Sequence, residues 1–420
     1  MATYEWAGDT PAVAEVLSFT VSYTSGTVNY TLTINGKDVT VAGVTDTAST
    51  VAALVLALND SEIPEFAEIT FSDASPELVL TADTAGKPIG TVTAAVSGGG
   101  TGTIDASPST TTSNAGPNVW SANNVKNVAD GTRGTLPTAG DVMFFRSSDV
   151  SLLYGLETAF AGDELFIEAS YTGTIGLPRT NIDGSTSYSE YRERLWDTGD
   201  ADVTIGGENG TGSSKLRFEV TDATDAAKYY IESTASSQDD DGAVELYVGS
   251  VGLVNVSING GTLSIFTPID GINGVSTLNA SSGAAVTADV NTRLNTVTMN
   301  DFASCICSGF VSVLTMQGAP TFTYIQKGGN AVTANIYGGT FNLDAGSTGT
   351  ITTVNLGPTA TLNATDLTED MTITNCTIEA GATINDSNDR LTFSNPIDLG
   401  QSGLTDVSLD LGRGINIQKS

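Results

Sequence analysis

The chain has 420 residues, with 16 basic against 48 acidic side chains and a formal net charge of −32. A chain of this length exceeds one ordinary hydrophobic core, so we expect two or three folded units. Strong negative charge repels nucleic-acid backbones and anionic membranes, and this argues against either as a partner. Histidine is absent, which excludes histidine-dependent catalytic triads and removes the commonest transition-metal ligand.

Glycine, threonine, serine, asparagine and valine are frequent and the usual helix formers are scarce, so the composition predicts a mainly β chain. The three cysteines are Cys305, Cys307 and Cys376, an odd number for a disulfide framework, and we expect them to be small fillers within strands. The first residues lack the basic and apolar regions of a signal peptide, and no apolar run is long enough to cross a membrane. We therefore expect synthesis inside a cell without classical secretion.

Residues 1–97 are predicted to form a small α+β domain. The dipeptide Asn35-Gly36 lies between two alternating runs, which is a strong hairpin signal. Residues 50–59 are rich in Ala and Leu and predict one helix, with Ser49 as its N-cap and an end before Pro64. One sheet covered by this helix is the simplest packing. Apolar patterns predict six strands, at residues 17–23, 30–34, 38–41, 66–71, 78–81 and 89–96.

The next segments differ sharply in composition. Residues 98–118 contain almost nothing to bury, and we interpret them as a Gly/Ser/Thr-rich linker or arm. Residues 119–241 form an irregular β region, with short strands predicted at 142–145, 164–167 and 215–220 between long polar stretches. These strands are interpreted as the first coils of a solenoid that carries long insertions.

From residue 242 to 420 the sequence repeats about every twenty residues. Seven segments align when they start at Leu253, Val275, Leu294, Val311, Thr333, Ile351 and Asp370. Their fourth position is always aliphatic, namely Val256, Leu278, Val297, Leu314, Ile336, Val354 and Ile373. The positions on either side are Ser, Thr or Asn in twelve of fourteen cases. One apolar column between two polar columns is typical of stacked parallel strands that bury one face.

The repeat also predicts a bend and a cap. The first position is usually apolar, but it lies three residues before the aliphatic column, so a bend must separate the two. The variable period favours a right-handed parallel β-helix over a strict six-residue left-handed coil. A solenoid needs its open edge covered, and residues 404–417 are the candidate C-terminal cap or partner-contact strand.

Two carboxylates in an aromatic stretch are the candidate sugar-binding or sugar-cleaving residues of this chain. Glu190 and Glu193 lie between Tyr188 and Asp197, beside two arginines and a tryptophan. Paired carboxylates cleave glycosidic bonds, and aromatic rings next to them suit sugar binding. The alternative interpretation is a surface loop or short helix at a subunit contact. We expect no catalytic residue and no cofactor.

Acidic runs are the candidate metal ligands. Asp239, Asp240 and Asp241 precede Gly242 and offer oxygen ligands for calcium, although their spacing differs from that of an EF-hand loop. The segment from Asp197 to Asp202 is a second candidate of the same kind. The alternative in both cases is a solvated turn.

Two regions resemble parts of bacteriophage proteins. The piece Val119-Trp-Ser-Ala-Asn-Asn124, followed by Pro137-Thr-Ala-Gly-Asp141 and Phe144-Phe145, resembles the opening strand of autotransporter-like and phage-encoded β-solenoids. The N-terminal unit, with its Thr-Ile-Asn-Gly-Lys hairpin and Ile63-Pro-Glu-Phe66, is similar to small domains of tailed-phage structural proteins.

The resemblance implies a non-enzymatic virion component, either a head decoration or fibre protein or a tail part. It also implies a homotrimer that docks through its N-terminal domain on the major capsid protein or another virion protein, made in the host cytoplasm and displayed on the virion surface. The short body, poor in aromatics, favours the head. The alternative is a tailspike or tail-fibre adhesin that binds or cleaves host polysaccharide, with a host-surface glycan as its partner.

Overall fold

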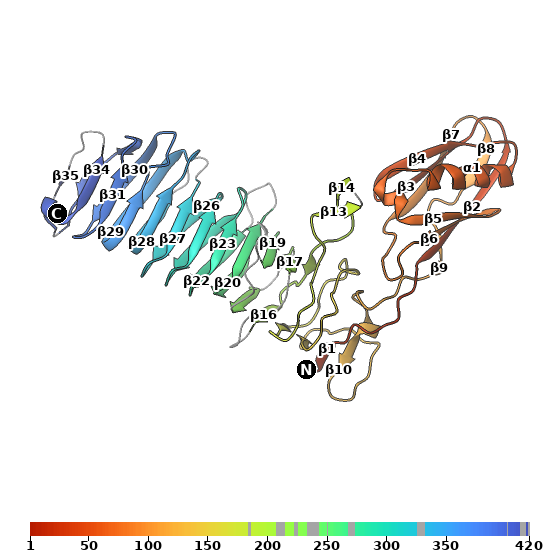
Figure 1. Cartoon of the computed structure of the whole chain (residues 1–420), viewed down its shortest axis with the longest axis horizontal. Helices are drawn as coiled ribbons and strands as arrows, with labels where there is room; N and C mark the ends of the chain where they lie inside the picture. Colours follow the sequence, from red (N-terminus) through yellow and green to blue (C-terminus); the bar gives the residue numbers. More distant parts are fainter. Residues whose placement is uncertain are drawn as a thin grey trace.

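The computed structural model describes residues 1–183, 186–206, 215–221, 226–232, 243–249, 251–267, 274–325, 332–400, 402–411 and 417–418. The chain is mainly β, with 52% of residues in strands and 6% in helices, and a β-solenoid of about 10 turns occupies residues 142–411. Figure 1 shows the solenoid as a stack of strands with a small α+β unit at its N-terminal end. The predicted fold class is therefore confirmed. Within the described residues, no helix is long and apolar enough to cross a membrane.

The chain begins in the solenoid and enters the small domain afterwards. Strand β1 (Thr3–Trp6) pairs antiparallel with β10 (Val125–Asn127) and parallel with β11 (Val142–Phe145). The carboxylate of Asp141 accepts a hydrogen bond of 2.6 Å from the backbone N–H of Ala2, which fixes the start of β1. The small domain is thus an insertion between β1 and β10 (Figure 1). The predicted boundary at residue 1 is wrong, because a four-residue strand without its distant partners carries no signal of where it pairs.

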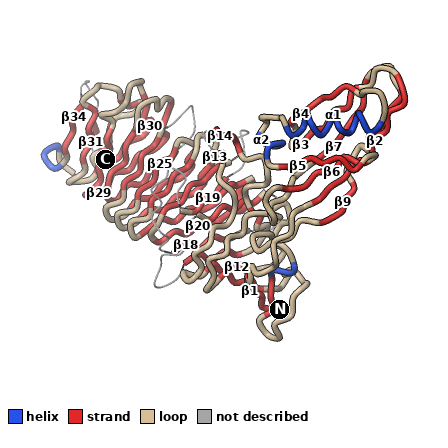
Figure 2. The backbone as a smooth tube through the Cα atoms, turned by 45° about the vertical axis from the view of Figure 1, so that its right-hand side comes forward, coloured by secondary structure: helices blue, strands red, loops and turns tan. Residues whose placement is uncertain are grey.

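The inserted domain has two sheets and its own hydrophobic core. One sheet has the order β5-β6-β2-β8 with β9 also on β2, and the other has the order β4-β3-β7. Helix α1 packs between them through buried Val51, Leu54 and Leu58, whereas a single sheet was predicted (Figure 2). Its elements are β2 (Val16–Ser25), β3 (Asn29–Ile34), β4 (Lys37–Ala42), α1 (Thr47–Asn59), α2 (Pro64–Ala67), β5 (Ile69–Ala74), β6 (Glu77–Ala82), β7 (Val92–Ser97), β8 (Thr101–Ile104) and β9 (Ser109–Thr112).

Short sequence motifs in this domain predict the hairpin correctly, but they misplace the N-cap of α1 and the start of one strand. The predicted hairpin is confirmed, since β3 and β4 pair antiparallel around Asn35 and Gly36, both with positive φ. The N-cap of α1 is Asp46 and not Ser49, because the Asp46 carboxylate accepts the backbone N–H of Ser49 at 2.7 Å. Phe66, predicted to start a strand, lies in the short helix α2, where Pro64 occupies a first-turn position that favours helix.

The predicted linker at 98–118 is wrong for much of its length. Strands β8 and β9 within it both pair antiparallel with β2, so they complete the sheet of the inserted domain. Backbone hydrogen bonds hold a strand in place whatever its side chains, and an edge strand of Gly, Ser and Thr buries little. Composition therefore cannot distinguish such a strand from a linker.

The solenoid coils present two main faces, each a stack of parallel strands. Face A consists of β11, β12 (Glu164–Ile167), β16 (Asp202–Gly206), β18 (Lys228–Glu232), β20 (Val251–Asn259), β22 (Gly274–Ser281), β24 (Arg293–Met299), β26 (Phe310–Met316) and β30 (Met371–Ile378), with the first parts of β28 (Thr333–Leu343) and β29 (Gly349–Asn363). Face B consists of β15 (Trp196–Asp197), β17 (Leu216–Val220), β19 (Val244–Val248), β21 (Thr262–Phe266), β23 (Ala285–Ala288), β25 (Ser304–Cys307), β27 (Thr321–Tyr324), β31 (Thr383–Asp386) and β34 (Ser408–Leu411), with the ends of β28 and β29.

A dry column of inward side chains runs through face A, as the repeat predicts. Each member pairs with the next in register and all are buried. The members are Met143, Leu165, Val203, Tyr229, Val256, Leu278, Val297, Leu314, Ala334, Val354 and Cys376. The strands predicted at 142–145, 164–167 and 215–220 form β11, β12 and β17, which confirms them as early solenoid strands.

Two predicted members of this column lie in neighbouring columns. Ile336 pairs with Met316 and Leu356, two residues beyond the true member, and Ile373 pairs with Ile351. Both are buried, because a shift of two residues keeps a side chain on the same face and the bend absorbs a shift of three. The bend itself is confirmed: residues 294 and 297 of β24 are both buried and both paired in register.

The remaining elements extend or cap the coil. The three cysteines are free and buried on β25 and β30, which confirms them as fillers. Strand β34 adds to β31, and Val407, Leu409 and Leu411 pack against the main core, whereas residues 412–416 of the predicted cap lie outside the described residues. The other elements are η1 (Ala122–Asn124), β13 (Thr180–Asp183), β14 (Thr186–Ser189), β32 (Leu391–Phe393), β33 (Ile397–Asp398), η2 (Leu404–Asp406) and β35 (Ile417–Gln418).

An aromatic cluster closes the N-terminal end of the solenoid. Trp6 stacks on Phe145 at 5.4 Å between ring centroids, and Trp120 meets Trp196 edge-on at 4.6 Å. Phe160 lies edge-on to Trp196 at 5.6 Å. All three tryptophans of the chain therefore join segments that are far apart in sequence. Such rings bury large areas, and the cluster fixes β1 to the first coils.

Candidate functional site

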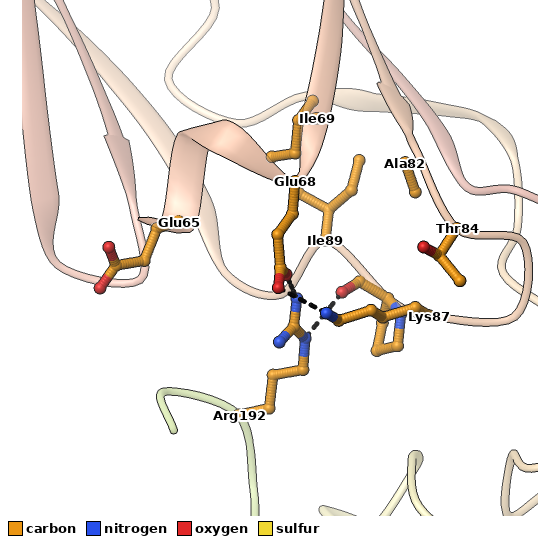
Figure 3. Close-up of a pocket in the computed structure, with 9 residues that line it drawn as sticks. Glu65, Glu68, Ile69, Ala82, Thr84, Lys87, Ile89 and Arg192 are labelled. Carbon is orange, nitrogen blue, oxygen red and sulfur yellow. Dashed lines mark hydrogen bonds and ion pairs between the residues drawn. The ribbon is translucent and has the colours of Figure 1, made fainter. Parts of the chain in front are cut away.

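The aromatic stretch predicted to bind sugars forms the joint between the inserted domain and the solenoid. The hydroxyl of Tyr188 donates to Glu68 of the inserted domain at 2.9 Å, and Tyr191 and Arg192 donate to the second carboxylate oxygen of Glu68. Lys87 pairs with Glu68 from the domain side, and Figure 3 shows Lys87 and Arg192 converging on Glu68. The stretch is a loop at a contact, as the alternative interpretation had it, but the contact is within one chain.

The joint is tightly filled. The cavity beside Glu68 and Arg192 measures about 10 Å³, which is room for about one water molecule. Burial would raise the pKa of Glu68, but hydrogen bonds from Lys87, Tyr191 and Arg192 outweigh it and lower the pKa to about 2. The carboxylate is therefore ionised at any ordinary pH. It serves as an anchor for the domain, and the cavity beside it has room for about one water molecule.

The two predicted carboxylates of this stretch have separate surroundings. Glu190 has a side chain only 3% exposed and forms an ion pair of 3.2 Å with Arg192, so it supports the joint. Glu193 is exposed and lies on the other side of the loop, toward face B. The structure therefore does not bring these two together as a pair, because successive loop residues point to different neighbours.

Three arginines converge on one buried carboxylate on face B. Glu245 of β19 has a side chain 3% exposed and accepts hydrogen bonds from Arg179 at 2.9 Å and Arg194 at 3.0 Å. Arg217 of β17 places its Nε 3.4 Å from the other oxygen. Arg179 also lies over the ring of Phe266, 3.8 Å from its centroid. These contacts fasten the residues next to Arg179 and those next to Arg194 onto the outer surface of the early coils.

A second pair of carboxylates lies next to this cluster. Asp197 of β15 and Glu219 of β17 are register partners on adjacent parallel strands. Burial and then the negative charges of Glu193 and Asp197 raise the pKa of Glu219 to about 7. Asp197 accepts hydrogen bonds from Thr221 at 2.7 Å and from the backbone N–H of Gly199 at 2.9 Å. Near neutral pH, a carboxylic acid and a carboxylate can therefore stand side by side, which is the requirement for general acid–base chemistry.

Sequence reasoning missed Glu219. Alternation within the strand at residues 215–220 places it on the outer face, but its pairing with Asp197 depends on a coil length that the insertions make irregular. The sequence shows which residues are acidic, but it does not show the coil length that would have predicted the pairing of Glu219 with Asp197.

The metal candidates gain no support from the described residues. Asp239, Asp240 and Asp241 lie outside the described residues. In the second candidate segment, Asp202 pairs with Lys228 at 2.7 Å, and Asp197 is used by Thr221 and Gly199. Across the part of the chain that the structure describes, no group of three or more acidic or cysteine side chains has metal-binding geometry.

Comparison with protein-family models, curated proteins and solved structures finds no match for this chain.

Proposed function

We propose that the chain is a non-enzymatic structural protein of a bacteriophage virion, a surface-exposed head decoration or fibre protein. The observation that carries the proposal is the way the inserted domain is fixed at the base of the rod. The domain has its own core, and its Glu68 is held by Lys87 from the domain and by Arg192 from the solenoid (Figure 3). Tyr191 of the solenoid also donates a hydrogen bond to Glu68. A stiff body with a separately folded module at one end suits docking at that end and projection at the other.

The charge of the chain supports a role on the outside of a particle. A net charge of −32 keeps a crowded protein soluble and disfavours contact with DNA. On this proposal the inserted domain binds the major capsid protein or another virion protein, and the solenoid projects or lies across neighbouring subunits. The body acts mechanically, and three copies form the working unit.

Imaging tests the proposal directly. Particles that lack the gene product are compared with wild-type particles by cryo-electron microscopy, and purified full-length chain is then added back. We expect loss of density on the capsid surface and its return on addition of the chain. Loss of density only at the tail tip would contradict the head position. The virion role would be contradicted altogether if the two kinds of particle looked the same and purified wild-type virions did not contain this chain.

Mass photometry of the purified chain tests its assembly. The chain has a mass of 43.1 kDa, so a trimer gives a peak near three times that value. A single peak at the monomer mass across the accessible concentrations would contradict the trimer.

A second candidate is a tailspike or fibre adhesin that cleaves host polysaccharide, favoured by Glu219 beside Asp197. Glycosidases use one protonated and one ionised carboxyl, and the pKa of Glu219 near 7 fits the acid. Purified chain is incubated with host-surface polysaccharide, and polymer length is measured by size-exclusion chromatography. Shortening that disappears in Glu219→Gln would support the candidate, and unchanged polymer would argue against it.

A further inference from the structure

A shallow groove lies on face A, on the side of the solenoid formed by β18, β20 and β22. Its volume is about 120 Å³ and it opens to solvent along the strands. Two lining residues, Ile231 and Ile258, have buried side chains. The other lining residues are uncharged apart from one carboxylate, and they are Tyr230, Glu232, Ser257, Asn259, Asn279 and Ser281.

The lining follows from the stacking of the coils. Tyr230 pairs in register with Ser257, which pairs with Asn279 on the next coil. Two residues further along the same strands, Glu232 pairs with Asn259, and Asn259 with Ser281. Alternate residues of a strand point to the same side, so two outward rows border the groove. Tyr230 is 44% exposed, a large exposed fraction for an aromatic side chain.

The polar row continues beyond the groove. From Asn279 the register partners along face A are Thr298, Thr315, Asn335 and Asn355. Some amides are linked along the row, as between Asn355 and Asn335 at 2.8 Å. The row offers hydroxyl and amide groups at each strand spacing of about 4.8 Å, so an extended ligand finds repeated partners.

We propose that this groove binds a neutral oligosaccharide. A sugar ring has one apolar C–H face, which suits the exposed ring of Tyr230, and hydroxyl edges, which suit the serine and asparagine side chains. The carboxylate of Glu232 accepts hydrogen bonds from hydroxyl groups. The net charge of −32 repels polyanions, so the expected ligand carries no acidic groups. The groove lies on face A and the acidic pair lies on face B, so the two sites are separate. Binding in the groove needs no catalysis, and it can be tested whether or not the chain is a virion protein.

The test uses full-length chain and defined probes. Malto-, cello- and chito-oligosaccharides are titrated by saturation-transfer NMR, with hyaluronan as the polyanionic comparator. We expect at least one neutral series to bind and hyaluronan not to bind. Tyr230→Ala should weaken that binding at least tenfold, whereas Tyr230→Phe should retain it. Phe302→Ala is the matched control, because Phe302 is also an exposed aromatic residue, at 78%, but lies in a turn outside the groove and the row, and it should change binding by less than twofold.

Three results would overturn the proposal. One is the absence of binding to all three neutral series, and another is equal weakening by the two alanine variants. The third comes from sedimentation velocity of the same samples: if Tyr230→Ala turns an oligomer into a monomer, the face is an interface between copies of the chain. Thermal melting checks that each variant is folded. We expect it to be, because substitutions at exposed positions usually change stability little.

Discussion

The early and late coils of the solenoid share one stacking pattern but differ in their outer surfaces. In residues 196–248, the outer side of face B carries Asp197, Arg217, Glu219 and Glu245, covered in part by an insertion. In strands β22 to β31, which the structure describes in full, the charged residues are Arg293 and Asp386. Asp386 is buried, so Arg293 is the one charged side chain on the outer surface of these strands. The other outward side chains of these strands are mostly Thr, Ser and Asn, and acidic residues of the late coils such as Asp301 and Glu379 lie in the turns between strands.

The difference separates what holds the solenoid together from what it displays. Both regions bury inward residues and stack parallel strands, so the outer surface is free to vary. On the strand faces, charge is concentrated where loops and the inserted domain attach, since ion pairs need partners from other segments. Neutral rows occupy the surface that projects away from these attachments. The variants below test this division, beginning with the largest expected effect.

Removal of a ring from the base should destabilise the early coils most. Trp196→Ala leaves a cavity among Trp120, Phe145 and Phe160, with an expected cost of about 3–5 kcal/mol. Phe341→Ala in the late coils is the matched change, of similar cost because Phe341 is also fully buried. Hydrogen exchange should separate them: the first should release β1 and β10–β12, and the second only the coils next to β28.

The opposite exchange pattern would contradict this picture. If Phe341→Ala released β1 as strongly as Trp196→Ala, the solenoid would unfold as one unit, and the base cluster would have no special role in holding the N-terminal strand.

Loss of the anchor carboxylate should loosen the inserted domain by a smaller amount. Glu68→Gln removes the charge that Lys87 and Arg192 contact, at an expected cost of about 2 kcal/mol, reduced by partial solvent exposure. The pKa of Glu68 is lowered in the folded chain to about 2, so its contribution is complete above pH 4.5 and is lost as pH falls toward 2. Hydrogen exchange of residues 64–74 and 186–197 measures the loosening.

A control distinguishes this anchor from general acidity. Glu77→Gln changes an exposed carboxylate of the same domain and should leave exchange at the joint unaltered. Equal loosening in both variants would mean that net charge, and not the specific contact with Arg192, governs the joint.

The late coils could be predicted from sequence because their coils are short and regular. Between Val256 and Leu314 each column member pairs with a residue 17 to 22 positions further on, so the aliphatic pattern is visible by alignment. The site residues could not be predicted, because Glu68 and Arg192 are separated by 124 positions. Long insertions such as that between Leu165 and Val203, which pair in register, hide the coil length in the early region. Alternation fixes which face a side chain takes, but only coil length fixes its neighbour.

Neutralising Glu219 should stabilise the early coils modestly. The pKa of Glu219 is raised to about 7, so the folded chain loses stability as pH rises from 4.5 to 7 and keeps this cost above pH 7. Glu219→Gln removes the cost, with an expected gain of about 1 kcal/mol at pH 8 after allowance for solvent screening, and no gain at pH 4. Denaturant unfolding at the two pH values checks this.

Glu193→Gln provides the matching test, because the charge of Glu193 is one cause of the raised pKa. It should lower the pKa of Glu219 in an NMR titration. A pKa unmoved by this change would place the cause in burial and Asp197 alone.

The smallest effect is expected on the neutral rows of the late coils. Asn355→Ala removes the amide that donates to Asn335 at 2.8 Å, a half-exposed hydrogen bond with an expected contribution of about 0.5 kcal/mol. Asn355→Asp is the sharper variant, since it adds charge to a row that carries none and leaves the Asn335 carbonyl oxygen facing an acceptor. Its cost should exceed that of the alanine variant and shrink as salt is added, because salt screens the repulsion between the added carboxylate and the rest of a chain with a net charge of −32. The loss of stability in Asn355→Asp could instead equal that in Asn355→Ala and be independent of salt. In that case the fold would not require an uncharged surface, and the absence of charge there would serve what the surface binds.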